Sequence, residues 1–182
     1  MKTNFQPLPV AALFAAFLLL TTQAFAQDDK SKRPSPPAKI SSAVGDAKVT
    51  IDYSRPSLKG RKVGTDLAPY GKVWRTGANE ATTFEVDKDV KVEGKTLPAG
   101  KYSLYTIPGE SEWTVIFNKV SDQWGTKYDE GQDALRVKVK PKKAPQMTEV
   151  FTMNVAKSGK VAMMWDNTEV DFTVASAGKA SQ

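Results

Sequence analysis

The 182-residue sequence contains no cysteine and no histidine, and these two absences exclude most of the common catalytic chemistries. A Ser-His-Asp triad, a cysteine nucleophile, an imidazole general base and an ordinary zinc site all require one of the two residue types. The missing thiol also excludes the lipid anchor that is attached to an N-terminal cysteine. Carboxylates, lysine, tyrosine, serine and oxygen ligands for hard ions remain available.

Long apolar runs are also scarce, and the one candidate lies at the N-terminus. Lys2 is followed by the apolar stretch from Val10 to Leu20 and by the small-x-small sequence Ala24-Phe25-Ala26. This pattern predicts a secretory signal peptide over residues 1–26, cleaved after Ala26, because the apolar stretch is too short to span a bilayer. The mature chain is therefore expected in the periplasm or secreted, with no membrane span.

The net charge of +6 is modest for a chain of this length. In an exported protein, a basic balance points to anionic envelope polymers or lipid headgroups more readily than to nucleic acid. Solubility is the simpler explanation of the same charge. We therefore expect no nucleic-acid partner, and the sequence leaves the oligomeric state open.

Composition divides the mature chain into three parts. Residues 27–39 (QDDKSKRPSPPAK) are polar and rich in proline, which predicts a disordered tether. Residues 40–175 have the size and apolar content of one domain, and residues 176–182 read as a disordered tail.

Within the domain, apolar residues recur with a period of two. Residues 48–53, 82–87 and 135–139 each alternate apolar with polar side chains, and turn residues recur every eight to twelve positions. This pattern predicts an all-β domain, an antiparallel β-sandwich of roughly eight to ten short strands, with a closed barrel as the alternative. Two connections, 54–73 and 120–134, are long for so small a domain, which is typical of functional loops.

The stretch from Leu67 to Val86 gathers an aromatic ring, a cation, an amide and a carboxylate on a connection that contains two glycines. One interpretation is a ligand site, with a tryptophan face for stacking and polar groups for hydrogen bonds. The other is structural: the tryptophan plugs one end of the sandwich, the arginine pairs with a carboxylate and the asparagine shapes a turn. Two arginines of the preceding loop would add an anion-binding rim if that loop folds nearby. The candidate ligand-binding residues are Arg55, Arg61, Trp74, Arg75, Asn79 and Glu80.

Several ordered motifs resemble one known family, the exported bacterial family called domain of unknown function 2911. The resemblance covers about residues 34–174 and implies an envelope location and a β-rich domain. It brings no established activity, cofactor or catalytic residue. The motifs are YSRP at 53–56, GRKV at 60–63, WRTGANEAT at 74–82, LPAGKY at 97–102, WTVIFN at 113–118 and QWG at 123–125, with a closing segment from Trp165 to Phe172.

Three functional hypotheses follow. The first is an uncharacterised envelope protein that acts as a non-catalytic binding or accessory domain for a small polar or anionic ligand or a glycan. The second is a carboxylate-dependent, glycosidase-like hydrolase, in which Glu80 works with Asp166 or Asp129. The third is a structural or interaction protein. We assign no catalytic residue and no cofactor. We also assign no metal site, because the acidic loop at 122–133 does not have the spacing of a calcium-binding EF-hand.

Overall fold

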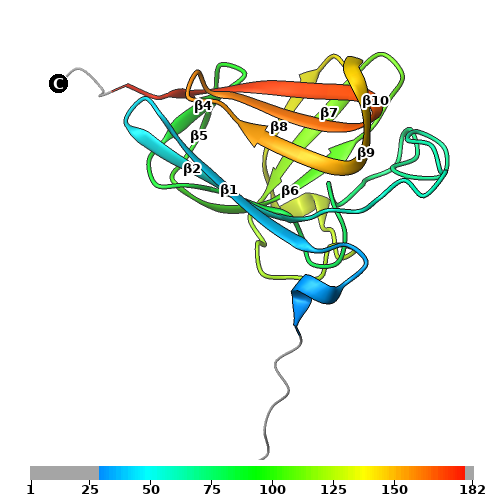
Figure 1. Ribbon diagram of the computed structural model, residues 1–182. Coiled ribbons are helices and arrows are strands. Elements are labelled where there is room, and N and C mark those ends of the chain that lie inside the picture. Colours follow the sequence, from blue (N-terminus) through cyan, green and yellow to red (C-terminus); the bar gives the residue numbers. More distant parts are fainter. Residues whose placement is uncertain (1–28, 179–182) are drawn as a thin grey trace, which may run out of the picture.

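The computed structural model describes residues 29–178, in which two antiparallel sheets pack face to face (Figure 1). The larger sheet has six strands in the order β1-β2-β3-β6-β7-β8, and the smaller has four in the order β5-β4-β10-β9. The strands are β1 (Pro37–Val44), β2 (Ala47–Ser54), β3 (Thr83–Val86), β4 (Val90–Val92), β5 (Lys95–Leu97), β6 (Gly100–Ile107), β7 (Trp113–Asn118), β8 (Asp133–Val139), β9 (Lys142–Val155) and β10 (Lys160–Ser176).

The predicted all-β sandwich is confirmed, with ten strands at the upper end of the expected number. Each sheet keeps two edge strands, so the alternative of a closed barrel is not formed. Two three-residue 3-10 helices, η2 (Lys30–Lys32) and η3 (Glu130–Gln132), are the helical elements of residues 29–178. No helix in this range is long and apolar enough to cross a membrane.

Alternation along the strands places one apolar face of each sheet in the core. In β2, Val49, Ile51 and Tyr53 are buried, whereas the residues between them are exposed or half-buried. At the centre, the rings of Phe84 and Phe117 lie 5.0 Å apart in an edge-to-face arrangement. Burial of apolar surface such as these rings stabilises the fold by roughly 25 cal/mol per Å².

A second aromatic group fills one end of the sandwich. The ring of Trp74 stacks on Trp165 at 5.4 Å, and it meets Phe151 and Trp113 edge-on at 5.1 and 6.4 Å. Trp74 therefore packs as the structural interpretation predicts, with one ring face already covered by Trp165.

The folded domain begins earlier than the expected residue 40. Pro37 pairs with Ser54 at the start of β1, and the amide of Arg55 donates to the carbonyl of Pro36. Residues 30–32 form η2 (Figure 1). Residues 37–39 of the predicted tether are thus paired in the first hairpin, and residues 30–36 lie in η2 and its connection to β1. The predicted signal peptide, residues 27–28 and most of the predicted tail lie outside the described residues.

The outer face of the larger sheet, which points away from the smaller sheet, is only half covered. The loop 119–132 lies across β6 and β7 on this side (Figure 1, yellow-green). Its carbonyls accept hydrogen bonds from Ser103 (to Val120, 2.8 Å), Tyr105 (to Lys127, 2.6 Å) and Asn118 (to Asp129, 2.8 Å). The other half of this face, over β1 to β3, is open.

Candidate ligand-binding cleft

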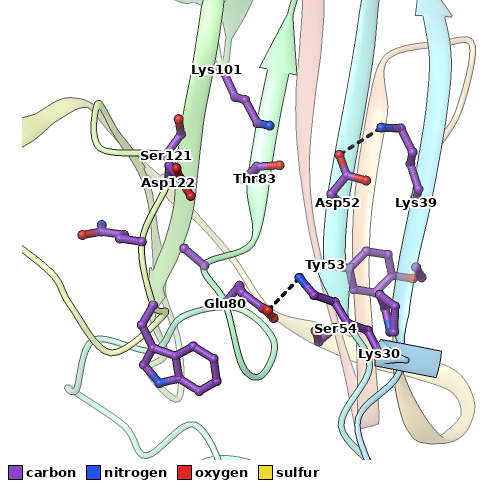
Figure 2. A pocket seen from close by; sticks show the side chains of 15 residues that line it. Lys30, Lys39, Asp52, Tyr53, Ser54, Glu80, Thr83, Lys101, Ser121 and Asp122 are labelled. Carbon is purple, nitrogen blue, oxygen red and sulfur yellow. Dashed lines mark hydrogen bonds and ion pairs between the residues drawn. The ribbon is translucent and has the colours of Figure 1, made fainter. Parts of the chain in front are cut away.

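The open half of the outer face forms a cleft of about 990 Å³, which we call the outer cleft (Figure 2). One wall is the loop 121–124, and the other is the N-terminal segment with β1. A volume of this size is within the range of small-molecule sites. The lining residues are Lys30, Pro37, Ala38, Lys39, Asp52, Tyr53, Ser54, Glu80, Ala81, Thr83, Lys101, Ser121, Asp122, Gln123 and Trp124.

The loop wall is held by the segment that the sequence singled out. The amide of Ala81 donates to the carbonyl of Gln123, and the amide of Gly125 donates to the carbonyl of Asn79, both at 3.0 Å. These two bonds flank a β-bridge between Glu80 and Trp124. Trp124 is thereby fixed at the rim. Because 48% of its surface is exposed, its ring is available for stacking.

The floor of the outer cleft consists of polar side chains that alternate with the core residues of β2, β3 and β6. Asp52 and Thr83 are register partners on adjacent strands, and Lys101 projects from β6 toward the same space (Figure 2). Thr83 is only 9% exposed, yet its Oγ1 has no hydrogen-bond partner in residues 29–178. A buried hydroxyl without a partner costs roughly 1–3 kcal/mol, so this group is available for a ligand that enters the cleft.

Glu80 is an ion-pair anchor at the cleft wall. Its carboxylate lies 2.9 Å from the Lys30 amine and 2.9 Å from the Arg33 guanidinium. Hydrogen bonds from Lys30, from its own backbone amide and from Arg33 lower the pKa of Glu80 to about 2. The carboxylate is therefore ionised at neutral pH and ties the N-terminal segment to the domain.

The charges that line the outer cleft balance. Three lysines face three carboxylates, and two of these pairs are closed as ion pairs: Lys30 with Glu80, at 2.9 Å, and Lys39 with Asp52, at 3.2 Å. A cleft with balanced charge and many hydrogen-bonding groups suits a hydroxyl-rich ligand better than a polyanion.

Asn79, another predicted site residue, lies beneath the wall and has a structural role. Its backbone adopts a left-handed conformation with φ +61°. Its amide donates to the carbonyl of Ser35 at 3.0 Å and to the hydroxyl of Ser54 at 3.3 Å. Asn79 therefore shapes a turn, as the structural interpretation predicts, and also holds the N-terminal segment against β2.

The structure separates the remaining predicted residues. Trp74 and Arg75 line a second, smaller hollow on the far side of the loop 123–126. Arg55 donates to the carbonyl of Phe151 and the hydroxyl of Thr152, and so joins its loop to β9. Arg61 donates to the carbonyls of Leu58 and Ser57 within its own loop. Neither of these two arginines lines the outer cleft or the smaller hollow, so they do not form the expected rim.

The acidic loop is held by its own hydrogen bonds. Asp129 accepts from the amide of Gly131 at the start of η3, and Asp133 accepts from Tyr128, Asn118 and Arg136. Within residues 29–178 no group of three or more carboxylates is arranged to hold a metal ion.

Glu80 is the one predicted site residue among those that line the cleft, and the residues not predicted include Asp52, Thr83, Lys101 and Trp124. The period of two already placed Asp52 and Thr83 on polar strand faces, but it could not tell which polar face would stay uncovered. Trp124 belongs to the long loop 120–134, and its position opposite Glu80 depends on a pairing between residues more than forty positions apart.

Taken together, the fold and the site define an antiparallel two-sheet sandwich with an uncovered polar cleft on the outer face of its larger sheet. A family model described as "Protein of unknown function (DUF2911)" matches residues 35–174, and the chain belongs to that family. No curated protein and no solved structure matches the chain significantly.

Proposed function

We propose that the chain is a non-catalytic binding domain of the bacterial envelope whose outer cleft takes a hydroxyl-rich ligand of the glycan class. The single observation that carries this proposal is the unpartnered, buried Oγ1 of Thr83 in the floor of an open cleft. Trp124 at the rim supports it, because an exposed indole offers the apolar ring face on which a sugar stacks.

Envelope location is part of the same proposal and depends on the sequence of residues 1–26. If it is correct, the exported protein begins at Gln27, which N-terminal sequencing of the extracytoplasmic fraction would reveal. If uncleaved protein stays in the cytoplasm, the proposed envelope location is wrong, but the proposal of ligand binding in the outer cleft is unaffected.

The hydrolase hypothesis has less support. A glycosidase of the two-carboxylate type needs one group that is protonated before the reaction, and Glu80, with a pKa of about 2, is ionised. Its suggested partners are engaged elsewhere: Asp129 caps η3, and Asp166 accepts from the amide of Val63. No contact of the described residues specifically favours the third hypothesis, the interaction protein, which stays a prediction.

A titration with three probes tests the binding proposal: a neutral N-acetylglucosamine tetramer, a maltotetraose and dextran sulfate as a polyanion. Tryptophan fluorescence and amide chemical shifts would follow binding. We expect a neutral oligosaccharide to bind and to shift the amides of Asp52, Thr83, Lys101 and Trp124. Binding by dextran sulfate alone, or shifts confined to other faces, would contradict the proposal.

A matched pair of variants locates the ligand. Trp124→Ala should weaken binding about tenfold through the loss of ring stacking. Met147→Ala is the control, because Met147 is similarly exposed, at 55%, but lies on β9 outside the cleft. Equal losses in both variants would mean that the oligosaccharide adheres to exposed apolar groups in general.

A further inference from the structure

A second hollow, of about 340 Å³, lies next to the outer cleft on the other side of the same loop. We call it the Arg75 hollow. Loop residues 121–124 line the outer cleft, and Gly125, Thr126 and Tyr128 line this hollow. Val73, Trp74, Arg75 and Tyr105 complete its lining.

Strand-like pairing explains why Arg75 faces this hollow. Trp74 and Thr106 exchange two backbone hydrogen bonds, at 2.7 and 2.9 Å, so residue 74 extends the larger sheet beside β6. Successive side chains of an extended segment point to opposite faces. Because Trp74 packs into the sandwich, Arg75 must lie on the outer face, where Tyr105 also points.

Gly125 closes over the stem of Arg75. A Cβ atom at Gly125 would lie 2.5 Å from Cδ of Arg75 and 2.8 Å from the carbonyl oxygen of Asn79. Only glycine permits this approach, and the resulting contact fixes the aliphatic part of the side chain. The guanidinium is thus held in place before any ligand arrives.

Among the residues that the structure describes, no carboxylate forms an ion pair with the Arg75 guanidinium. Its Nε is shielded from solvent and has no acceptor, and the guanidinium makes no hydrogen bond or ion pair with any residue of 29–178. Arg136, on β8, has the partners that Arg75 lacks: it contacts Asp133 at 2.7 Å, Glu130 at 3.0 Å and the hydroxyl of Tyr128 at 2.7 Å. An arginine that is held rigidly and left unpaired is the arrangement of an anion receptor, because its planar fork of donors matches an oxyanion.

The tyrosines around Arg75 do not supply the missing negative charge. Burial, together with the hydrogen bond to Asp133, raises the pKa of Tyr128 to about 12. Burial also raises the pKa of Tyr105. Both phenols therefore stay neutral at physiological pH, and they present ring surface to the hollow.

We propose that the Arg75 hollow binds the carboxylate of a small molecule with a flat apolar body. One uncompensated guanidinium matches one negative charge, which favours a carboxylate over a doubly charged phosphate. The aromatic and aliphatic walls formed by the side chains of Tyr105, Tyr128 and Val73 suit an apolar ring. This site does not require the glycan proposal, because it shares with the outer cleft only the loop between them.

Benzoate is the direct probe, with inorganic phosphate and benzyl alcohol as comparisons. The Arg75 Nε–H signal in a side-chain NMR spectrum reports the bond that the structure lacks. We expect benzoate to shift this signal saturably, and benzyl alcohol, which has the ring without the charge, to leave it unchanged. A response to phosphate without one to benzoate, or no saturable response to either anion, would overturn the proposal.

Two charge-removing variants make the test specific. Arg75→Met keeps the apolar stem under Gly125 and should weaken benzoate binding at least tenfold. Lys127→Met removes an equal charge from the same loop but from a side chain that does not line the hollow, so benzoate binding should stay within about twofold of wild type. Equal weakening in both would show nonspecific attraction and overturn the site. If Arg75→Met fails to fold, Arg75→Lys, which keeps the charge but loses the fork, should also weaken binding; undiminished binding in Arg75→Lys would contradict the role of the guanidinium.

Discussion

Two groups of buried polar side chains on the outer face of the larger sheet differ in one respect, their hydrogen-bond partners. Under the loop 119–132, Ser103, Tyr105 and Asn118 all bond to loop carbonyls at 2.6–2.8 Å. Beside that loop, the hydroxyl of Thr83 and the Nε of Arg75 have no partner in residues 29–178. Each of the two unpartnered groups belongs to a residue that lines a hollow, whereas of the three partnered residues only Tyr105 does so.

This difference separates a structural from a functional use of the same sheet face. A fold ordinarily satisfies its buried donors, because each one left alone costs about 1–3 kcal/mol. The buried groups under the loop 119–132 follow that rule, and their hydrogen bonds hold the loop in place. Two positions depart from the rule, Thr83 in the open half and Arg75 under Gly125, and these are the positions to which we assign ligands.

The largest expected effect comes from the covered half. Asn118 is fully buried, donates to Asp129 and Asp133 at 2.8 Å and accepts from the amide of Val120 at 3.1 Å. Asn118→Ala would leave these groups unpaired and should lower the free energy of unfolding by about 3 kcal/mol. Urea unfolding measures the loss, and hydrogen exchange should show faster exchange of the loop amides.

Ser103→Ala is the milder companion, because it removes one hydrogen bond from the same loop. It should cost about 1 kcal/mol. If Asn118→Ala costs no more than Ser103→Ala, the loop is not held by these buried bonds and the contrast between the two halves fails.

A smaller effect is expected at the wall of the outer cleft. Glu80→Gln breaks the ion pairs to Lys30 and Arg33, but the carboxylate is 41% exposed, so solvent screening limits the loss to less than about 1 kcal/mol. The pKa of Glu80 is lowered in the folded state, so its contribution is complete above about pH 4.5 and is lost as the pH falls toward 2.

Release of the N-terminal segment is the sensitive readout of this change. Trypsin should cut after Lys30 or Lys32 faster in Glu80→Gln than in wild type at neutral pH, with the rest of the domain intact. Asp122→Asn, in the opposite wall of the cleft, is the control and should not change the rate. Equal rates in Glu80→Gln and wild type would mean that the segment is anchored by other contacts.

The sequence was sufficient to predict the sandwich because alternation is a local signal. The alternation within a few positions predicts which side chains of a strand are buried, as it does for Val49, Ile51 and Phe84. The sequence also singled out the segment from Trp74 to Glu80, and two of its residues, Asn79 and Glu80, contact the N-terminal segment that forms one wall of the cleft.

The assembly of the cleft could not be predicted in the same way. Glu80 finds its partners at Lys30 and Arg33, in a segment whose composition predicted a disordered tether. Arg55 and Arg61 lie close to Trp74 in the sequence, but the fold directs them to backbone carbonyls of β9 and of their own loop. In the sequence, Thr83 does not differ from other polar strand residues. Its site depends on the loop 119–132, which does not cover this part of the outer face.

The free energy of unfolding of Thr83→Val tests the central claim most directly, because it requires no knowledge of the ligand. Valine keeps the shape of threonine and removes only the hydroxyl, which has no partner to lose. We predict that stability in urea is unchanged or rises by up to about 1 kcal/mol. A loss of more than about 1 kcal/mol would show that the hydroxyl serves the fold, and it would contradict the assignment of Thr83 to a ligand.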